Sequence, residues 1–183
     1  MKTPRIALLL GLLLVSSLLA LESGVGSTPG GAERVPLPRD YQTTFVEVRA
    51  SNQTAQGLLG TIYASPAAAA VRELASLSYP DGSVFVMEWA QPVKGANGEP
   101  LVDANGNWQK GVVVRLDVMR REKGFGAAYG DKRAGEWEFA SYGVDGSPLP
   151  PPPTGWASCA ACHAKAAARD FVFRGRFPAI DSN

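Results

Sequence analysis

Residues 79–90 read YPDGSVFVMEWA, in which a tight-turn signal is followed directly by a strand signal. Proline presets the backbone of the first turn position, and the Asp-Gly pair completes the turn. From Ser83 to Ala90 the sequence alternates with the two-residue period of a β-strand, which places successive side chains on opposite faces. One face then carries Phe85, Met87 and Trp89, and the other carries Val84, Val86 and Glu88. A tight turn before such a strand is typical of an antiparallel sheet.

The rest of the chain supplies further strands and a few helices. We predict strands at Thr43–Ala50, Gly111–Met119 and Glu136–Tyr142. Ser65-Pro66 begins a predicted helix that extends to about Leu77, because serine caps helices and proline suits their first position. Two Asn-Gly pairs within residues 94–111 predict a protruding, hairpin-like excursion. The predicted fold class is therefore α+β, mostly an antiparallel sheet with a few helices.

The composition limits both the size and the partners of the protein. Its 183 residues suit one domain, and a 45% hydrophobic content suffices for a core. The formal net charge of +1 gives no electrostatic basis for binding nucleic acid.

The N-terminus has the organisation of an export signal. Lys2 and Arg5 precede an apolar run over residues 6–21, which is shorter than the roughly 20 residues that a spanning helix prefers. We interpret residues 1–26 as a signal peptide, or as an N-terminal anchor if they are not cleaved. Residues 27–40 are interpreted as a flexible lead-in, and residues 41–177 as the folded domain. The domain is expected in the periplasm or another exported location, and at a membrane only if the anchor is kept.

Both cysteines and the only histidine of the chain lie within one short motif, Cys159-Ala160-Ala161-Cys162-His163. C-x-x-C-H is the sequence at which c-type haem is attached. Two thiols reach the two vinyl groups of one porphyrin, and the adjacent imidazole binds the iron as proximal ligand. One covalently attached haem c is therefore the predicted cofactor. The alternatives are a redox cysteine pair, which lacks a thioredoxin-like pattern, a zinc site, which lacks further ligands, and a plain disulfide.

The second axial position of the iron has no obvious ligand downstream, because only 20 residues follow His163 and none is Met or His. The position is either open or filled from upstream by Met87, Met119 or a lysine. If Phe85, Met87 and Trp89 face the iron, they form a dry apolar pocket that favours uncharged diatomic ligands over anions. If the Met87 sulfur instead binds the iron as distal ligand, the His163/Met87 pair suits electron transfer.

Other side chains give weaker indications. Phe45 is a further candidate for covering the iron. Glu136 and Glu138 could include a distal acid or base, although alternating charges more often mark the solvent face of a strand. Arg115 and Asp117 share a strand face, and they form either a surface pair or a pair near a haem propionate.

Five short pieces of the sequence, in this order, resemble the cytochrome P-460 and cytochrome c′-beta family. They are IYASPA (62–67), YPDGSV (79–84), GEWEF (135–139), CAACH (159–163) and DFVF (170–173). The resemblance covers about residues 41–175. It implies a mostly antiparallel β fold with a c-type haem packed against the sheet, commonly in a homodimer. It also implies Cys159 and Cys162 as thioether donors and His163 as proximal ligand.

Two branches of this family differ at the haem. In cytochromes P-460 a lysine also bonds to the porphyrin and the protein oxidises hydroxylamine, whereas in the c′-beta branch aromatic residues cap an open iron that binds nitric oxide. Met87 stands about where the cross-linking lysine is expected, and Lys94 is the nearest lysine downstream, in a Gly- and Asn-rich loop. We therefore expect a protein that binds NO or handles related nitrogen species without the cross-link. Its expected partners are a small diatomic ligand or a redox protein. The alternatives are a His163/Met87 electron carrier and a hydroxylamine-oxidising enzyme.

Overall fold

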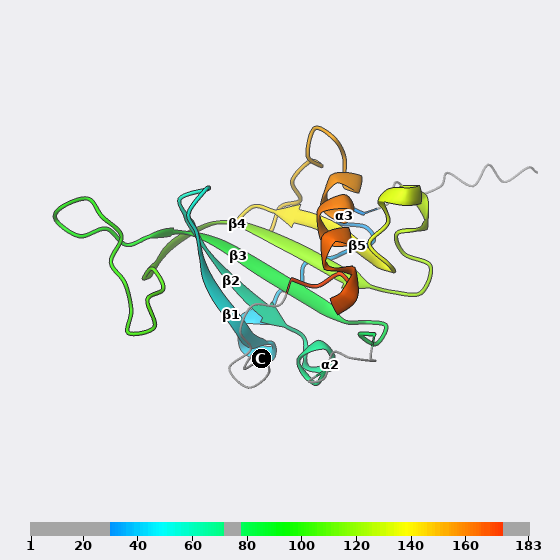
Figure 1. Cartoon of the computed structure of the whole chain (residues 1–183), viewed down its shortest axis with the longest axis horizontal. Coiled ribbons are helices and arrows are strands. Elements are labelled where there is room, and N and C mark those ends of the chain that lie inside the picture. Colours follow the sequence, from blue (N-terminus) through cyan, green and yellow to red (C-terminus); the bar gives the residue numbers. More distant parts are fainter. Residues whose placement is uncertain (1–29, 72–77, 174–183) are drawn as a thin grey trace, which may run out of the picture.

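One five-stranded antiparallel sheet organises the protein, and its strands lie side by side in chain order (Figure 1). A computed structural model describes residues 30–71 and 78–173. The strands are β1 (Val46–Gln53), β2 (Leu58–Ala64), β3 (Val84–Pro92), β4 (Lys110–Arg121) and β5 (Trp137–Tyr142). Each strand pairs with the next one along the chain, so the predicted α+β, mostly antiparallel fold is confirmed.

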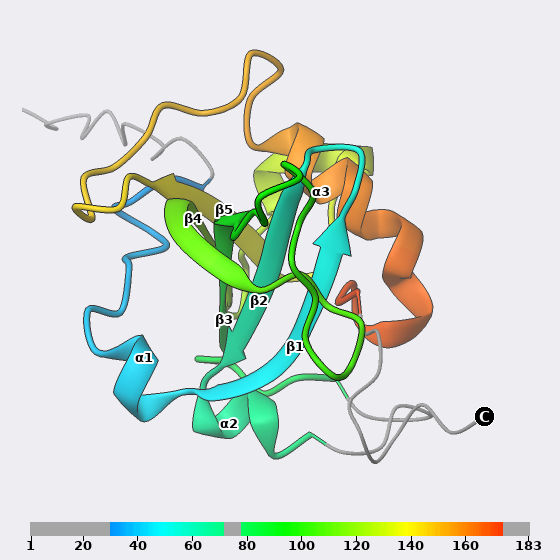
Figure 2. The same ribbon diagram turned by 90° about the vertical axis from the view of Figure 1, so that its left-hand side faces the viewer.

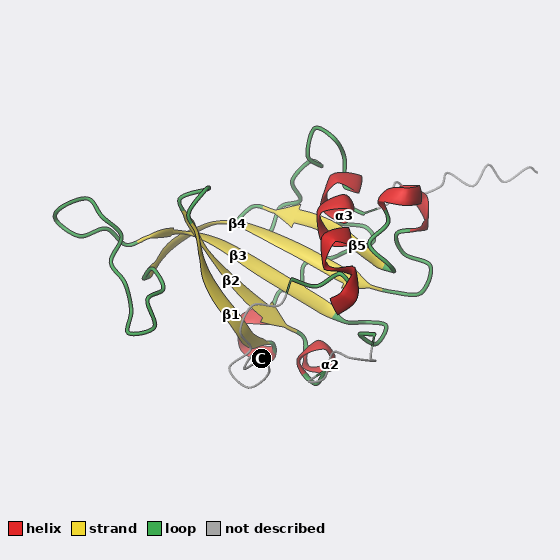
Figure 3. Cartoon of the chain, viewed as in Figure 1, coloured by secondary structure: helices red, strands yellow, loops and turns green. Residues whose placement is uncertain are grey.

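The helices are short (Figure 3). They are α1 (Tyr41–Thr44), α2 (Pro66–Ala69), η1 (Ala127–Lys132), α3 (Ala157–His163) and η2 (Ala164–Arg169), where η marks a 3₁₀-helix. The predicted start of α2 is confirmed, since the Ser65 hydroxyl accepts a hydrogen bond from the Ala68 amide at 3.4 Å. The predicted continuation of this helix towards Leu77 is wrong at residues 70 and 71, because the helix ends at Ala69. The chain turns there to pack Val71 against the core, which outweighs the helix propensity of the alanines. Residues 72–77 lie outside the described residues.

The first two strands differ most from the prediction. Thr43 and Thr44 belong to α1 instead of a strand, because their hydroxyls donate to the Asp40 carbonyl at 2.9 and 3.0 Å. The first strand therefore begins at Val46. The second strand, β2, was not predicted from the sequence. It lies between β1 and β3, so both of its edges are hydrogen-bonded.

β3 and β4 form the long hairpin that the sequence predicts, and residues 93–109 extend it beyond the end of the sheet (Figure 1). Gly98 and Gly106 adopt positive φ angles of 79° and 80°, which explains the two Asn-Gly pairs. The excursion is tied to β1 by the Asn52 side chain. Its amide oxygen accepts from the Trp108 amide at 2.7 Å, and its amide nitrogen donates to the Gly106 carbonyl at 3.1 Å.

One face of the sheet, which we call the back face, is covered by the segment that leads into β1. Val35 and Tyr41 are buried there against Val86, Leu116 and Val118. Figure 2 shows this segment on the opposite side of the sheet from α3. Residues 30–40 of the predicted flexible lead-in are therefore packed instead of free, since burying Val35 anchors them. The predicted signal or anchor, residues 1–26, lies outside the described residues.

Two carboxylates are buried on the back face, which corrects the expectation that Glu138 lies in solvent or beside the iron. Glu138 accepts from the Gly30 and Gly126 amides at 2.9 and 3.0 Å, and from the Arg34 guanidinium at 2.5 and 2.8 Å. The sequence could not reveal this burial, because Arg34 reaches Glu138 from 104 residues away.

The second buried carboxylate of the back face is Glu88. It accepts from the Tyr41 hydroxyl at 2.5 Å, from the Gln42 amide at 2.8 Å and from Lys110. Burial alone would raise the pKa of Glu88, but these hydrogen bonds, that from Lys110 first, outweigh it and lower the pKa. The carboxylate is therefore ionised and paired at neutral pH.

The other face, which we call the front face, carries the larger apolar core. Phe85, Met119, Trp137 and Phe139 project from it and are all buried. The C-terminal helices pack against these side chains, and α3 lies across the sheet (Figure 1). Within residues 30–71 and 78–173, no helix is long and apolar enough to pass through a membrane.

Replacing Glu138 with alanine tests whether its carboxylate fixes the N-terminal segment. The Arg34 guanidinium and two backbone amides would lose their acceptor, so we expect the free energy of unfolding to fall by about 3 kcal/mol. Urea unfolding of the haem-loaded protein measures this change. Glu122→Ala is the control, because the Arg120–Glu122 pair is partly exposed (33% and 29%) and should contribute less than about 1 kcal/mol. Equal losses in the two variants would contradict the anchoring role.

Candidate haem site

A cavity of about 420 Å³ lies between α3 and the front face of the sheet. α3 contributes Cys159, Cys162 and His163 to its lining, and β3 contributes Phe85 and Met87. The structure thus brings together all five side chains that the sequence singles out as haem contacts.

The helical geometry of α3 explains how the motif presents its ligands together. Residues three apart on a helix lie on the same side, which places Cys159 and Cys162 next to each other at the cavity. Ala160, between them, is fully buried, and its small side chain lets the helix approach the core closely. Both cysteines are free thiols, one half-buried and the other exposed. Burial, followed by the charge of Asp117, raises the pKa of the Cys159 thiol.

The imidazole of His163 is held in one orientation. Its Nδ1 lies 2.7 Å from the Phe171 carbonyl oxygen. Because a carbonyl can only accept, Nδ1 carries the proton of the neutral ring, and Nε2 is left with the lone pair that a metal needs. The ring also packs against Phe139 and Phe173, with centroids 4.9 and 5.1 Å away. Burial lowers the pKa of His163, against the opposing effect of the Phe171 hydrogen bond, and so favours the neutral ligand form.

The sheet forms an apolar wall of the cavity. Phe85 is buried, whereas Met87 is half-buried between strands β2 and β4. The Met87 methyl group occupies the space that a side chain at Gly60 would fill, so the thioether lies along the sheet over β2. Ile62 of β2 continues the same wall.

β1 adds two cavity residues that the sequence does not reveal. A β-bulge between Glu47 and Arg49 interrupts the alternation, and both Val48 and Arg49 then reach the cavity. The Arg49 guanidinium donates to the Phe173 carbonyl at 3.5 Å. A bulge inserts an unpaired residue and leaves no distinctive signal in the sequence. A regular two-residue period would therefore place only one of Val48 and Arg49 on this face.

The lining is not wholly apolar, since Arg49, Arg115, Ser141 and Ser158 also line the cavity, and Asp117 is its acidic group. Asp117 accepts from Trp89 Nε1 and from the Ser141 hydroxyl, each at 2.6 Å, and from the Arg115 guanidinium at 3.0 Å. The guanidinium also lies 4.8 Å above the Trp89 ring. The predicted pairing of Arg115 with Asp117 is therefore present, and it lies at the cavity. Three donors satisfy the carboxylate, so its charge is compensated within the wall.

Other candidates lie away from the cavity. Phe45 packs with the cluster on the back face, so the suggestion that it covers the iron is wrong. Glu136 lies beside Arg121 near the end of β4, and Glu138 is buried on the back face. The described residues that line the cavity include no lysine, and Lys94 is exposed in the excursion.

The side chains at the cavity match what a haem needs from a protein. Two thiols and a neutral imidazole with a free Nε2 face a largely apolar wall, which suits a flat apolar macrocycle with a metal at its centre. Cys159, Cys162 and His163 would hold the group, and Phe85 and Met87 would contact it. A bound haem would supply a redox-active iron able to bind small molecules.

This fold and this site define a haem protein built on an antiparallel sheet. A comparison with protein families supports the same conclusion, since the model of the family described as Cytochrome P460 matches residues 38–174. No curated protein matches the chain. The chain belongs to the cytochrome P460 family, and the predicted resemblance is confirmed. It is therefore a cytochrome, and membership of this family implies a haem cofactor.

Replacing Asp117 with asparagine tests the polar group of the cavity. The amide keeps one acceptor oxygen and can donate its NH₂ group to the Ser141 hydroxyl, but it loses the charge that pairs with Arg115, so we expect the free energy of unfolding to fall by about 1–3 kcal/mol. Asp103→Asn is a matched control, since Asp103 Oδ1 alone accepts both of its bonds, from the Asn105 and Asn107 amides. Urea unfolding of the haem-loaded variants compares them. An unchanged Asp117→Asn protein would show that the negative charge of Asp117 does not stabilise the fold.

Proposed function

We propose that the protein is an exported monohaem cytochrome c that binds nitric oxide, or handles related small nitrogen species, without a lysine–haem cross-link. The observation that carries this proposal is the apolar wall of Phe85, Met87 and Ile62, which lines the same cavity as His163. A charged ligand that enters an apolar space loses its hydration without compensation, whereas uncharged NO loses little.

Covalent attachment through Cys159 and Cys162 is part of the proposal. Each thiol adds across one vinyl group, so that sulfur bonds to one carbon and the proton goes to the other. The reaction needs reduced cysteines, and both thiols are free. His163, the next residue after Cys162, would then bind the iron through Nε2.

The lining of the cavity favours the branch without the cross-link. A lysine amine can react with the macrocycle only if the protein holds it against the ring edge. None of the described lining residues is a lysine, and Met87 occupies the position on β3 where the cross-link is expected. Hydroxylamine oxidation by a cross-linked haem is therefore the less supported alternative, and no residue is assigned a catalytic role.

Electron transfer with His163/Met87 ligation is a second candidate function, favoured by the presence of Met87 at the cavity. Against it stands the position of the thioether, whose methyl group lies over Gly60 on the sheet. An open second axial position, covered by apolar side chains, fits this arrangement better.

The export signal in residues 1–26 supports a periplasmic or otherwise exported location, where haem attachment takes place. Membrane association would follow only if this segment stays uncleaved. A homodimer, and a redox partner protein that exchanges electrons with the haem, are further parts of the proposal.

Replacing Cys159 and Cys162 together with alanine tests the attachment. We expect the wild-type chain, produced with haem-attachment machinery, to carry one haem that survives denaturation. The double variant should lose it to acidified organic solvent. Intact-protein mass spectrometry and the pyridine haemochrome spectrum measure both. A wild-type chain without covalent haem would overturn the proposed function.

Replacing Met87 with leucine separates the open site from methionine ligation. If Met87 is only part of the wall, the ferric and ferrous absorption spectra should remain five-coordinate and high-spin, with NO binding changed less than about tenfold, as expected for a volume-conserving swap. Met119→Leu is the matched control, because Met119 also lines the cavity, from β4. A methionine–iron charge-transfer band that disappears only in Met87→Leu would instead establish electron-transfer ligation. A haem-linked lysine peptide found by mass spectrometry would establish the cross-linked alternative.

A further inference from the structure

The end of η2 has an unusual backbone conformation. Among the described residues, Asp170 (φ 48°) and Phe171 (φ 65°) are the non-glycine residues with positive φ angles. Such angles are unfavourable for residues with a side chain, and two in succession persist only where neighbouring groups hold them. This pair lies immediately after the helices that carry the haem motif.

The hydrogen bonds at this helix end follow a known pattern. The Asp170 amide donates to the Ala167 carbonyl at 3.2 Å, and the Phe171 amide donates to the Ala166 carbonyl at 3.0 Å. These are the two bonds of a Schellman motif, in which glycine usually occupies the left-handed position. Asp170 occupies that position here, so its side chain offers a contact that glycine could not make.

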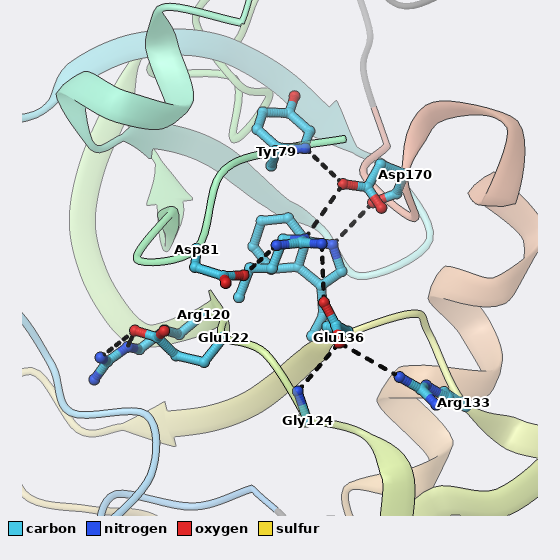
Figure 4. A network of polar contacts seen from close by, with 10 residues as sticks. Tyr79, Asp81, Arg120, Glu122, Gly124, Arg133, Glu136 and Asp170 are labelled. Carbon is cyan, nitrogen blue, oxygen red and sulfur yellow. Dashed lines mark hydrogen bonds and ion pairs between the residues drawn. The ribbon is translucent and has the colours of Figure 1, made fainter. Parts of the chain in front are cut away.

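The Asp170 side chain connects the helix end to the sheet (Figure 4). Its Oδ2 accepts from the Tyr79 amide at 2.7 Å and lies 3.7 Å from Arg121 Nε. Its backbone carbonyl accepts from Trp137 Nε1 at 2.9 Å. The side chains of Asp170 and Arg121 are only 15% and 14% exposed, so their attraction is weakly screened. Three groups from three segments thus fix one residue.

Arg121 is itself held by further carboxylates. It pairs with Asp81 in the turn before β3 and with Glu136 at 3.0 Å before β5. Figure 4 shows these acidic residues converging from separate segments of the chain. These ion pairs hold the Arg121 guanidinium in place, so that it can position the Asp170 carboxylate.

The Phe171 ring is fixed from another side. It lies over Gly135, and a Cβ atom at that position would come within 2.6 Å of the ring. With both residues held, the Phe171 carbonyl oxygen points at His163 Nδ1, 2.7 Å away. The second residue of the strained pair, Phe171, therefore supplies the carbonyl acceptor that orients the imidazole.

We infer that Asp170 is a positioning residue for the axial ligand of the haem, acting through the Phe171 carbonyl on His163. This inference rests on the proposed function, in which His163 binds the iron. A firmly held acceptor at Nδ1 makes the imidazole a stronger donor at Nε2, which stabilises ferric over ferrous iron. The Asp170 carboxylate thereby adjusts the reduction potential without touching the haem.

Substitutions of Asp170 in the haem-loaded full chain test this inference. In Asp170→Ala the turn loses its anchor, so the iron–histidine stretching band in the resonance Raman spectrum of the ferrous protein should move to lower frequency. The reduction potential should rise. Asp170→Asn suits the left-handed conformation and keeps an acceptor for the Tyr79 amide, so both values should return part of the way to wild type. If the iron is six-coordinate, the iron–histidine band is not observed. The NMR shifts of the His163 ring protons in the paramagnetic ferric protein are then measured instead.

A glycine at this position separates the carboxylate from the backbone conformation. Asp170→Gly adopts positive φ without strain but has no carboxylate, so we expect it to shift the stretching band and the potential as Asp170→Ala does. Wild-type values in Asp170→Gly, with a shift in Asp170→Ala, would show that the backbone conformation alone matters and would overturn the inference. Glu122→Gln is the matched control, since its carboxylate pairs with Arg120 near the same end of β4 and should shift neither value.

Failure of this inference differs from failure of the proposed function. A wild-type chain that carries no covalent haem contradicts the proposed function. A wild-type chain with a histidine-bound haem, whose stretching band and potential stay unchanged in both Asp170→Ala and Asp170→Gly, contradicts only the role of Asp170.

Discussion

The alternation of side chains along β5 is the constraint on which both layers of this protein depend. On the front face, Trp137 donates to the Asp170 carbonyl at 2.9 Å, and Phe139 packs against His163 at 4.9 Å. On the back face, Glu138 between them binds Arg34 of the N-terminal segment. A shift of one residue in the β4–β5 pairing would exchange the two faces. It would place the carboxylate in the cavity and the aromatic rings beneath the N-terminal segment, so neither layer could dock.

The carboxylates of both faces are compensated in the same way. Glu88 and Glu138 of the back face, and Asp117 of the cavity, each accept hydrogen bonds from at least three groups. Burying a carboxylate without such donors would cost several kcal/mol, on the order of the whole stability of a domain. The sheet can therefore carry acidic residues in its interior while the cavity wall stays electrically compensated. In the proposed function, that compensation leaves the selection of ligands to the apolar side chains of the wall.

Local patterns in the sequence predict a part of this structure, and long-range packing determines the rest. The two-residue period predicts β3, β4 and β5, and the C-x-x-C-H motif predicts the donors that line the cavity. β2 could not be recognised, because Leu59 and Thr61 are buried while Gly60 interrupts the apolar run. The burial of Glu138 also could not be predicted, since its partner Arg34 is supplied by a segment 104 residues earlier in the chain. Bulges and long-range ion pairs leave little local signal.

The two sides of the candidate site are built differently, and the difference bears on function. On the helix side, the Phe171 carbonyl orients His163 and Phe173 packs against its ring, while Phe139 reaches the ring from β5. On the sheet side, Met87 and Ile62 are apolar lining residues, and such positions tolerate exchange for side chains of similar volume. Phe139 belongs to both sides, because it projects from the sheet, lines the cavity and packs against the imidazole. Under the proposed function, exchanging Met87 or Ile62 would therefore alter the wall without touching the carbonyl that orients the imidazole, whereas exchanging Phe139 would change both.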